Sequence, residues 1–267
     1  MERRSFVRAS LLSATLATGL VPAASAASRV LTTAERVDGE FYELRVYTLK
    51  NEAQQRLVED YLQHAAIPAL NKLGSKPVGV FRDLEPEGMT KIYVLIPYKS
   101  LADFGRVQEE LSQNAAYNKA GAAYLTAPAT DPAYERIESS LLKAFAQMPQ
   151  IAIPAQKPRL FELRRYESAS ESAGKKKIEM FNKGEIDIFK RTGLTPVFFG
   201  ETIIGALRPN LTYMITFDDM AEHDKNWKAF GSDPEWKKIS GMPEYADAKI
   251  VSHITSTFLT PTSFSQI

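Results

Sequence analysis

The chain has 267 residues, a formal charge of +1 and no cysteine, with 44% hydrophobic and 24% charged residues. This ordinary globular composition argues against a disulfide scaffold, a collagen-like repeat and long disorder. The near-zero charge gives no electrostatic case for nucleic acid, whose binding draws on clustered lysine and arginine. The missing cysteines also exclude thiolate chemistry and cysteine-ligated zinc or iron–sulfur centres.

The first 26 residues carry the ordered elements of an export signal. Arg3 and Arg4 precede a weakly apolar stretch at 9–24, and Ala24-Ser25-Ala26 offers small residues to a signal peptidase. The pattern predicts a twin-arginine signal at 1–26 and a periplasmic or extracellular protein. An ordinary secretory signal or a retained anchor are the alternatives.

Removing this segment changes the charge but not the class of protein. Its three arginines and one glutamate give it a net charge of +2, so the remaining 241 residues carry −1. No later apolar run reaches the length of a membrane-spanning helix, so we expect no membrane span in the mature chain.

A repeat at an offset of 119 residues organises the rest of the chain. The sequence FYELRVY at 41–47 returns as LFELRRY at 160–166, and a Gly, a Pro and a Val also recur: Gly74, Pro77 and Val78 as Gly193, Pro196 and Val197. We infer a duplicated unit of about 100 residues, a common domain size. Unit 1 covers 40–147 and unit 2 covers 159–260. The proline-containing linker at 148–158 should be extended and stiff.

The elements of unit 1 follow from the spacing of its apolar residues. A strand near 40–48 is followed by a helix that Asn51 caps, Pro68 kinks and Gly74 ends. Strands near 77–83 and 90–97, a helix opened by Ser100 and a strand near 134–142 complete the unit.

Unit 2 repeats this order. Strands are expected near 159–167, 196–203, 210–217 and 248–259, with helices near 173–192 and 220–230 and a further turn at 232–235. The order β-α-β-β-α-β is that of a ferredoxin-like unit.

Several of these features resemble the NIPSNAP family. They are the Glu-Leu-Arg-x-Tyr strand, the helix ending in glycine before Pro-Val, the tyrosine-containing third strand and the Asp-Pro-Glu-Trp turn. The resemblance covers nearly all of residues 40–260 in two copies. It implies an α+β fold in which tandem ferredoxin-like (βαββαβ) units pack as a pseudo-dimeric α/β barrel, with two sheets face to face. It brings no agreed catalytic residues, although related barrels include cofactor-independent oxygenases, isomerases and a haem-binding variant.

Two polar stripes form the candidate ligand site. In the first strand, the apolar set of Tyr42, Leu44 and Val46 should face the helices, so the polar set should face the opposite sheet. The polar set and its repeat are Glu43, Arg45 and Tyr47, and Glu162, Arg164 and Tyr166. Both stripes would then point into one lumen between the sheets. Arginine there suits a carboxylate, enolate or phosphate oxygen, while tyrosine or glutamate can move a proton. A purely structural ion network is the alternative.

His253 is expected to join the second stripe, because the last strand of such a unit pairs beside the first. A ligand or proton-transfer role competes there with a structural hydrogen bond. We expect the other side chains of note to be solvated or in the core: His64, His223 and Lys175–Lys177 in solvent, and Trp227, Phe230 and Trp236 in the core.

Recognisable catalytic motifs are missing. The sequence has no metal-binding histidine pair, no nucleophile elbow and no phosphate-binding glycine loop. No metal site is therefore predicted, and the cofactor stays unknown.

Three functions remain open at this point. The first is an exported NIPSNAP-like protein that binds a small ligand in the polar lumen. The second is a cofactor-independent oxygenase or isomerase, in which Arg45 or Arg164 stabilises an oxyanion while His253 or Tyr166 moves protons. The third is a scaffold that binds a partner through its helix faces. Homo-oligomerisation is left open.

Overall fold

The computed structural model describes residues 39–86 and 88–267, so the predicted signal at 1–26 lies outside the described part. Unit 1 contains four strands and its helices in this order: β1 (Phe41–Leu49), α1 (Glu52–Tyr61), the π-helical turn η1 (Leu62–Ala66), α2 (Ile67–Lys72), β2 (Gly79–Asp83), β3 (Thr90–Tyr98), α3 (Leu101–Gln113), α4 (Ala115–Ala120), α5 (Ala122–Leu125) and β4 (Arg136–Ala144).

Unit 2 follows the same plan. Its elements are β5 (Leu160–Glu167), α6 (Glu171–Met180), the π-helical turn η2 (Phe181–Glu185), α7 (Ile186–Thr192), β6 (Thr195–Ile204), β7 (Asn210–Phe217), α8 (Met220–Ser232), α9 (Pro234–Ser240), α10 (Asp247–Ile250) and β8 (His253–Pro261). The short helices α4, α5 and α10 are absent from the prediction, and α10 occupies the start of the expected last strand.

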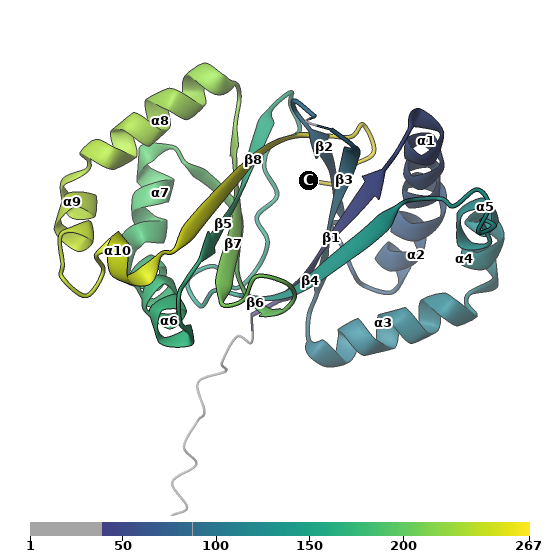
Figure 1. Cartoon of the computed structure of the whole chain (residues 1–267), viewed down its shortest axis with the longest axis horizontal. Coiled ribbons are helices and arrows are strands. Elements are labelled where there is room, and N and C mark those ends of the chain that lie inside the picture. Colours follow the sequence, from purple (N-terminus) through teal and green to yellow (C-terminus); the bar gives the residue numbers. More distant parts are fainter. Residues whose placement is uncertain (1–38, 87) are drawn as a thin grey trace, which may run out of the picture. The chain divides into compact units, whose positions relative to one another are not determined.

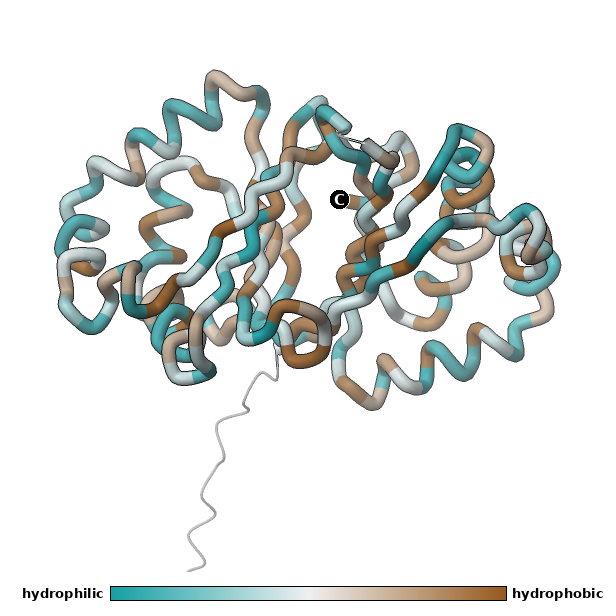
Figure 2. Tube along the Cα trace, in the orientation of Figure 1, coloured by the Kyte–Doolittle hydropathy of each residue, from teal (hydrophilic) through white to brown (hydrophobic). Residues whose placement is uncertain are grey.

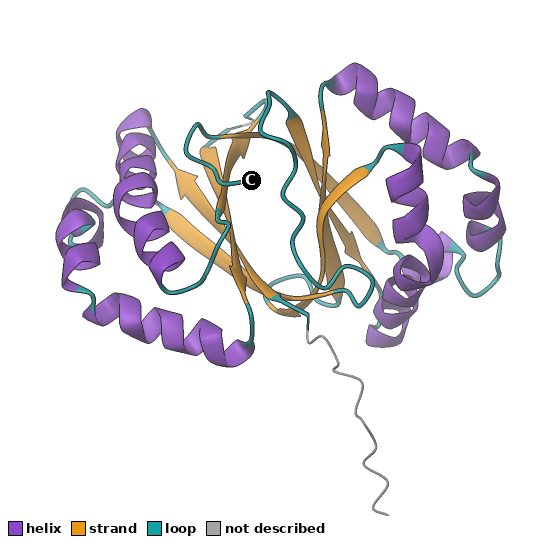
Figure 3. Ribbon diagram, turned by 180° about the vertical axis from the view of Figure 1, so that it is seen from behind, coloured by secondary structure: helices purple, strands orange, loops and turns teal. Residues whose placement is uncertain are grey.

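The eight strands close into one barrel in the order β1-β3-β2-β8-β5-β7-β6-β4. Within each unit the last strand pairs beside the first, as predicted, and β2–β8 and β4–β6 pairs join the units. Figure 1 shows α1–α5 on one side of the barrel and α6–α10 on the other. Figure 3 shows the same arrangement from behind. The predicted pseudo-dimeric α/β barrel is therefore confirmed.

Local sequence explains where the helices begin and end. The Asn51 side chain accepts from the Gln54 N–H at 2.9 Å and caps α1. Gly74 follows α2 with φ +95°, a left-handed conformation that glycine adopts without strain. The expected kink near Pro68 takes the form of the π turn η1. Unit 2 has the same turn with Asp187 at the proline position, so the proline is not required for it.

The barrel interior is an apolar core, which corrects the predicted orientation of the strands. Tyr42, Leu44 and Val46 lie inside the barrel, packed with apolar residues of both units such as Phe161 and Leu163. The polar set of β1 therefore faces the helices. Both faces of each barrel strand are buried, one in the barrel interior and one under the helices. The alternation of side chains therefore cannot tell which face points inward.

The C-terminus helps to fill this interior. Ile267 is 1% exposed and belongs to the interior cluster, with Ile151 of the linker packed against it. The backbone N–H of Gln266 donates to Val78 O at 3.0 Å and fastens the C-terminal segment beside β2. Figure 2 shows hydrophobic residues along the strands and on helix faces turned toward them. The polar stripes at 43–47 and 162–166 therefore do not line a lumen between the sheets, because the interior around Leu44 and Leu163 is apolar. No helix in the described part of the chain has the length and hydropathy needed to span a membrane.

Candidate functional site

The polar stripe of β1 lies under the helices of unit 1. Arg45 Nε and Nη2 both donate to Glu43 Oε1, at 3.0 and 2.9 Å, and Nη1 reaches the Tyr47 hydroxyl at 3.4 Å. Glu43 is 5% exposed and also accepts from the hydroxyls of Tyr98 and Ser139. Burial alone would lower the pKa of Arg45, but Tyr47 and Glu43 hold it above its usual value. The guanidinium is thus a fixed, permanently charged group.

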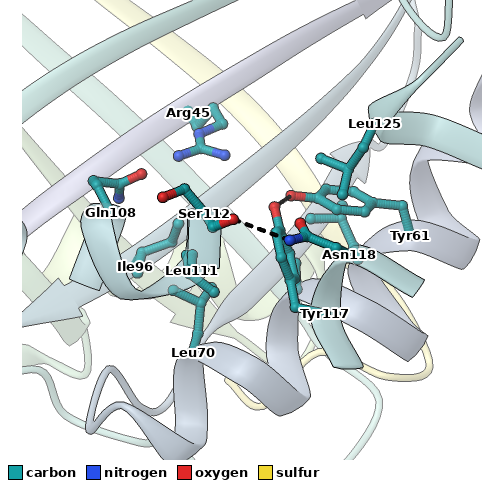
Figure 4. A pocket seen from close by; sticks show the side chains of 12 residues that line it. Arg45, Tyr61, Leu70, Ile96, Gln108, Leu111, Ser112, Tyr117, Asn118 and Leu125 are labelled. Carbon is teal, nitrogen blue, oxygen red and sulfur yellow. Dashed lines mark hydrogen bonds between the residues drawn. The ribbon is translucent and has the colours of Figure 1, made fainter. Parts of the chain in front are cut away.

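Arg45 borders a cavity of about 340 Å³ between the outer face of the sheet and the helices. Half of its lining residues are aliphatic, and the others bring amide, hydroxyl and guanidinium groups: Arg45, Tyr61, Leu62, Ala66, Leu70, Ile96, Gln108, Leu111, Ser112, Tyr117, Asn118 and Leu125. None of these is acidic. Figure 4 shows the guanidinium extending from its strand toward the space beside Gln108 and Ser112. The Arg45 side chain is 21% exposed, so it is anchored and still accessible.

Tyrosines form the opposite wall of this cavity. The hydroxyls of Tyr61 and Tyr117 lie 2.7 Å apart (Figure 4), and the ring of Tyr124 stacks on Tyr61 with centroids 3.8 Å apart. Burial, with smaller effects from neighbouring tyrosines, raises the pKa of Tyr61 far above its usual value. Tyr61 therefore stays a neutral phenol that can donate a hydrogen bond.

Unit 2 repeats the stripe with different neighbours. Arg164 Nη1 donates to Glu162 Oε1, and Nη2 reaches the Tyr166 hydroxyl at 3.3 Å. Glu162 is 1% exposed and accepts from Trp227 Nε1 at 2.9 Å. The Arg164 guanidinium lies 4.7 Å from the centroid of the Trp227 ring, so an indole occupies one face of it where unit 1 has a cavity. The Arg164 side chain is still 18% exposed.

Larger side chains occupy the space above Arg164. At the 119-residue offset, aromatic residues replace four lining residues of the unit 1 cavity: Phe181 for Leu62, Phe189 for Leu70, Trp227 for Gln108 and Phe230 for Leu111. These rings pack against one another within the core of unit 2. The two stripes are equivalent in sequence, but only the first borders the cavity described above.

A sequence model of the NIPSNAP family matches residues 42–149 and 161–266, once for each unit. The chain belongs to the NIPSNAP family. A comparison with curated proteins gives no significant match.

Solved structures share the fold of this NIPSNAP chain over most of its length. A "putative monooxygenase" from Fusobacterium nucleatum superposes with a TM-score of 0.54 at 12% identity, covering 84% of this chain and 93% of that one. One from Lactobacillus acidophilus gives 0.55 at 8%, covering 84% and 94%. An "anthrone oxidase-like protein" gives 0.50 at 11%, covering 84% and 92%. Identities this low show a common fold alone.

The structure corrects the positions of two histidines in the NIPSNAP chain. His253 pairs with Glu167 and is exposed, on the strand face opposite to Arg164, so the expected contact is absent. His223, expected in solvent, has a 15% exposed side chain and its Nε2 lies 3.4 Å from Glu162 Oε2. A hint was present, because the 119-residue offset pairs His223 with Phe104, which packs against the core of unit 1.

Lys177 also differs from expectation. It is 1% exposed instead of solvated, and its Nζ lies 3.1 Å from Oε2 of the buried Glu185. The tryptophans behave as predicted, because Trp227 and Trp236 pack against the unit 2 core around Phe230. His64 lies on the surface as expected, with a side chain 61% exposed.

The two polar stripes therefore do not meet in one lumen. Each lies on the outer face of its own half of the barrel, with the apolar interior between them. Within the described residues, no group of three or more histidine, aspartate or glutamate side chains could hold a metal ion. The candidate site is therefore the cavity of unit 1 with Arg45, Tyr61 and Tyr117.

Proposed function

We propose that unit 1 of this NIPSNAP protein binds a small organic anion, with an oxygen of the ligand on Arg45. The observation that carries this proposal is a guanidinium fixed by Glu43 that still borders a cavity of about 340 Å³ with no acidic lining residue. Arginine presents a planar fork of donors that matches a carboxylate or an enolate. The aliphatic walls favour an apolar ligand body, as in most small-molecule sites.

The same geometry argues against an isomerase. A general base needs a pKa near the working pH, and the pKa of Tyr61 is raised far above neutrality by burial. Arg45 keeps its charge, and Glu43 is occupied by Arg45, Tyr98 and Ser139. Binding, or stabilisation of an anion that the substrate itself provides, fits these groups better than proton abstraction by the protein.

A cofactor-independent oxygenase is the second candidate. Two structural neighbours are each described as a "putative monooxygenase", and Arg45 provides a fixed cation where a substrate enolate could lie. Haem fits the cavity poorly, because no histidine or methionine lines it and its two tyrosine hydroxyls bond to each other. Oxygen consumption on addition of a bound ligand distinguishes the oxygenase from a binding protein, in which the ligand is recovered unchanged.

The scaffold hypothesis has less support. Large exposed apolar side chains lie on separate elements, apart from Ile204 and Leu207 in one hairpin, and single exposed apolar residues are normal. Isolation of a stable partner that binds to the helix faces would support the scaffold hypothesis.

The anion site is tested by neutralising it without leaving a buried charge unpaired. The variant Glu43→Gln/Arg45→Met removes both charges, and Glu162→Gln/Arg164→Met is the matched control in unit 2. Aromatic carboxylates such as 2-naphthoate serve as probes in calorimetry. A hydrogen bond to a charged group contributes about 1.5–3 kcal/mol, so we expect about a 10- to 100-fold loss of affinity in the first variant alone. Equal losses in both variants would contradict the proposal.

We also propose that residues 1–26 direct export by the twin-arginine route. The support is the sequence order of paired arginines, apolar stretch and small residues. Fractionation of cells expressing the full chain tests it. The Arg3→Lys/Arg4→Lys variant should accumulate unprocessed in the cytoplasm, whereas unchanged export would point to an ordinary secretory signal.

A further inference from the structure

We infer that the ligand of the unit 1 cavity is a bicyclic aromatic carboxylate with a second oxygen, of the hydroxynaphthoate type. This inference rests on the proposed anion site and adds a second recognition point to it. The second point is the pair of hydroxyls on Tyr61 and Tyr117, which line the same cavity as Arg45.

Hydrogen-bond accounting shows spare donors at both points. Arginine has five N–H donors, and the three bonds that Arg45 makes to Glu43 and Tyr47 leave two for a ligand within the described part of the chain. Tyr61 and Tyr117 share one hydrogen bond, in which either oxygen can be the donor. Whichever hydroxyl donates, the other keeps its proton, since the described residues offer neither hydroxyl a further partner.

The protonation state of the tyrosine pair decides what it can recognise. Burial raises the pKa of Tyr61, so the phenol stays neutral and offers a proton. With no carboxylate in the lining, a cationic ligand would find no counter-charge, whereas an oxygen acceptor finds a donor at both points. The site therefore favours a ligand with a carboxylate and a second acceptor oxygen.

The size and walls of the cavity indicate the body of this ligand. Organic liquids fill roughly 0.5–0.6 of their volume, so a cavity of this size holds on the order of 170–200 Å³ of molecule, enough for two fused rings. Aliphatic residues such as Leu70, Ile96 and Leu111 form one side, and the tyrosine rings form another. A flat aromatic body gains both apolar burial and ring contacts there.

The test is a calorimetric ligand series on the full chain. The probes are 2-naphthoate, its 1-, 3- and 6-hydroxy derivatives, and the corresponding methyl derivatives, which match the hydroxyl in size but accept no hydrogen bond. We expect at least one hydroxy acid to bind about 5- to 10-fold more tightly than both 2-naphthoate and its methyl analogue, the range of one neutral hydrogen bond. The ligand series needs no protein variant, so it stands even where a variant fails to fold.

Variants then locate the gain. The double variant Tyr61→Phe/Tyr117→Phe should reduce the preference for the hydroxy acid to about 1-fold, while 2-naphthoate binding stays nearly unchanged. The control is Tyr166→Phe/Tyr213→Phe, because these two tyrosines of unit 2 also share a hydrogen bond, of 3.1 Å, but do not line the unit 1 cavity. It should leave the preference intact.

The outcomes separate the two proposals. If all acids bind alike and Glu43→Gln/Arg45→Met abolishes binding, the anion site stands and the second recognition point is overturned. A preference that survives the Tyr61→Phe/Tyr117→Phe variant overturns it as well. If no acid binds, or if the Arg45 variant binds normally, the proposed function itself fails.

Discussion

Units 1 and 2 share a strand motif, a π turn and helix order, yet they use the space under their helices differently. Unit 1 leaves a cavity above Arg45, and unit 2 fills the corresponding space with four aromatic rings. The backbone plan is common to both, so the cavity results from side-chain volume at a few positions. Unit 1 is the half suited to a ligand, and unit 2 is the half with the denser core.

One exchange of residues shows how closely the two halves compensate. The buried glutamate of each stripe needs a donor for its second oxygen. In unit 1 this donor is the Tyr98 hydroxyl, at 3.1 Å from Glu43, with Gln108 Nε2 donating to that hydroxyl in turn. In unit 2 the position of Tyr98 is occupied by Phe217, which has no hydroxyl to donate. Trp227, at the position of Gln108, donates directly to Glu162 instead. The indole both donates a hydrogen bond to Glu162 and lies against the guanidinium of Arg164.

The largest expected effect comes from a buried ion pair that only unit 2 has. Lys177 and Glu185 stand where unit 1 has Val58 and Ala66. Glu185→Ala leaves the ammonium of Lys177 buried and unpaired, so we expect a loss of about 3–5 kcal/mol in the free energy of unfolding. Urea denaturation measures it.

The control replaces both charges with apolar groups of similar volume. Lys177→Met/Glu185→Leu should recover most of the lost stability, because the uncompensated charge is gone. If the double variant is as unstable as Glu185→Ala, the Lys177–Glu185 pair itself makes a net favourable contribution to the free energy of unfolding.

The next effect tests whether Trp227 makes the two units unequal. Trp227→Gln removes packing from a half-buried site and a donor from Glu162, which should cost ~2–4 kcal/mol in stability. Adding Phe217→Tyr, the residue of unit 1, should restore part of this loss through a hydroxyl to Glu162. The double variant should also bind a second molecule of 2-naphthoate, measured as calorimetric stoichiometry. Unchanged stoichiometry would show that the remaining rings close the site without Trp227.

The order of elements was predictable because the repeat doubles every local signal. Asn51 and Ser170 cap the first helix of each unit at the same offset, and both helices end in a glycine with positive φ, Gly74 and Gly193. Closure of the barrel rested on the family resemblance. The face of each strand was not predictable, since Leu44 and Arg45 are both covered, one inside the barrel and one under helices.

The candidate site was only half predictable for a related reason. Arg45 stood out as a charge in a buried strand, whereas Tyr61, Gln108 and Tyr117 come from helices and meet only in the fold. The residue at the equivalent position of the other repeat indicates the burial that the sequence analysis missed at two residues. His223 lies opposite Phe104 and Lys177 opposite Val58, and an apolar partner indicates burial.

A smaller effect concerns the helices that roof the cavity. Helices α4 and α5 have no fully buried residue, and their tyrosines Tyr117 and Tyr124 pack against the core of unit 1. Tyr124 stacks on Tyr61 and also contacts the ring of Tyr47. An aromatic pair contributes about 0.5–1.5 kcal/mol, so Tyr124→Leu should lower the hydrogen-exchange protection of 115–125 by up to about tenfold. Global unfolding and protection of α9 in unit 2 should stay nearly unchanged. If protection falls equally across unit 1, helices α4 and α5 unfold together with the core and not as a separate segment.

The smallest expected effect is a pH dependence of stability that α9 of unit 2 has and α4 of unit 1 lacks. In unit 2, Arg191 binds Asp233 through two hydrogen bonds of 3.0 and 2.7 Å at the start of α9, whereas unit 1 has Lys72 and Asn114 there. The hydrogen bond from Arg191 lowers the pKa of Asp233 to about 2. A carboxyl whose folded pKa is lowered stabilises the fold above its unfolded pKa of about 3.9, and this stability is lost as the pH falls toward 2. Asp233→Asn should therefore lower the urea midpoint slightly at pH 6 and make a smaller difference at pH 2, where the carboxylate is about half protonated. An equal shift of the midpoint at both pH values would mean that Asp233 stabilises α9 as its N-cap, and not through its ion pair with Arg191.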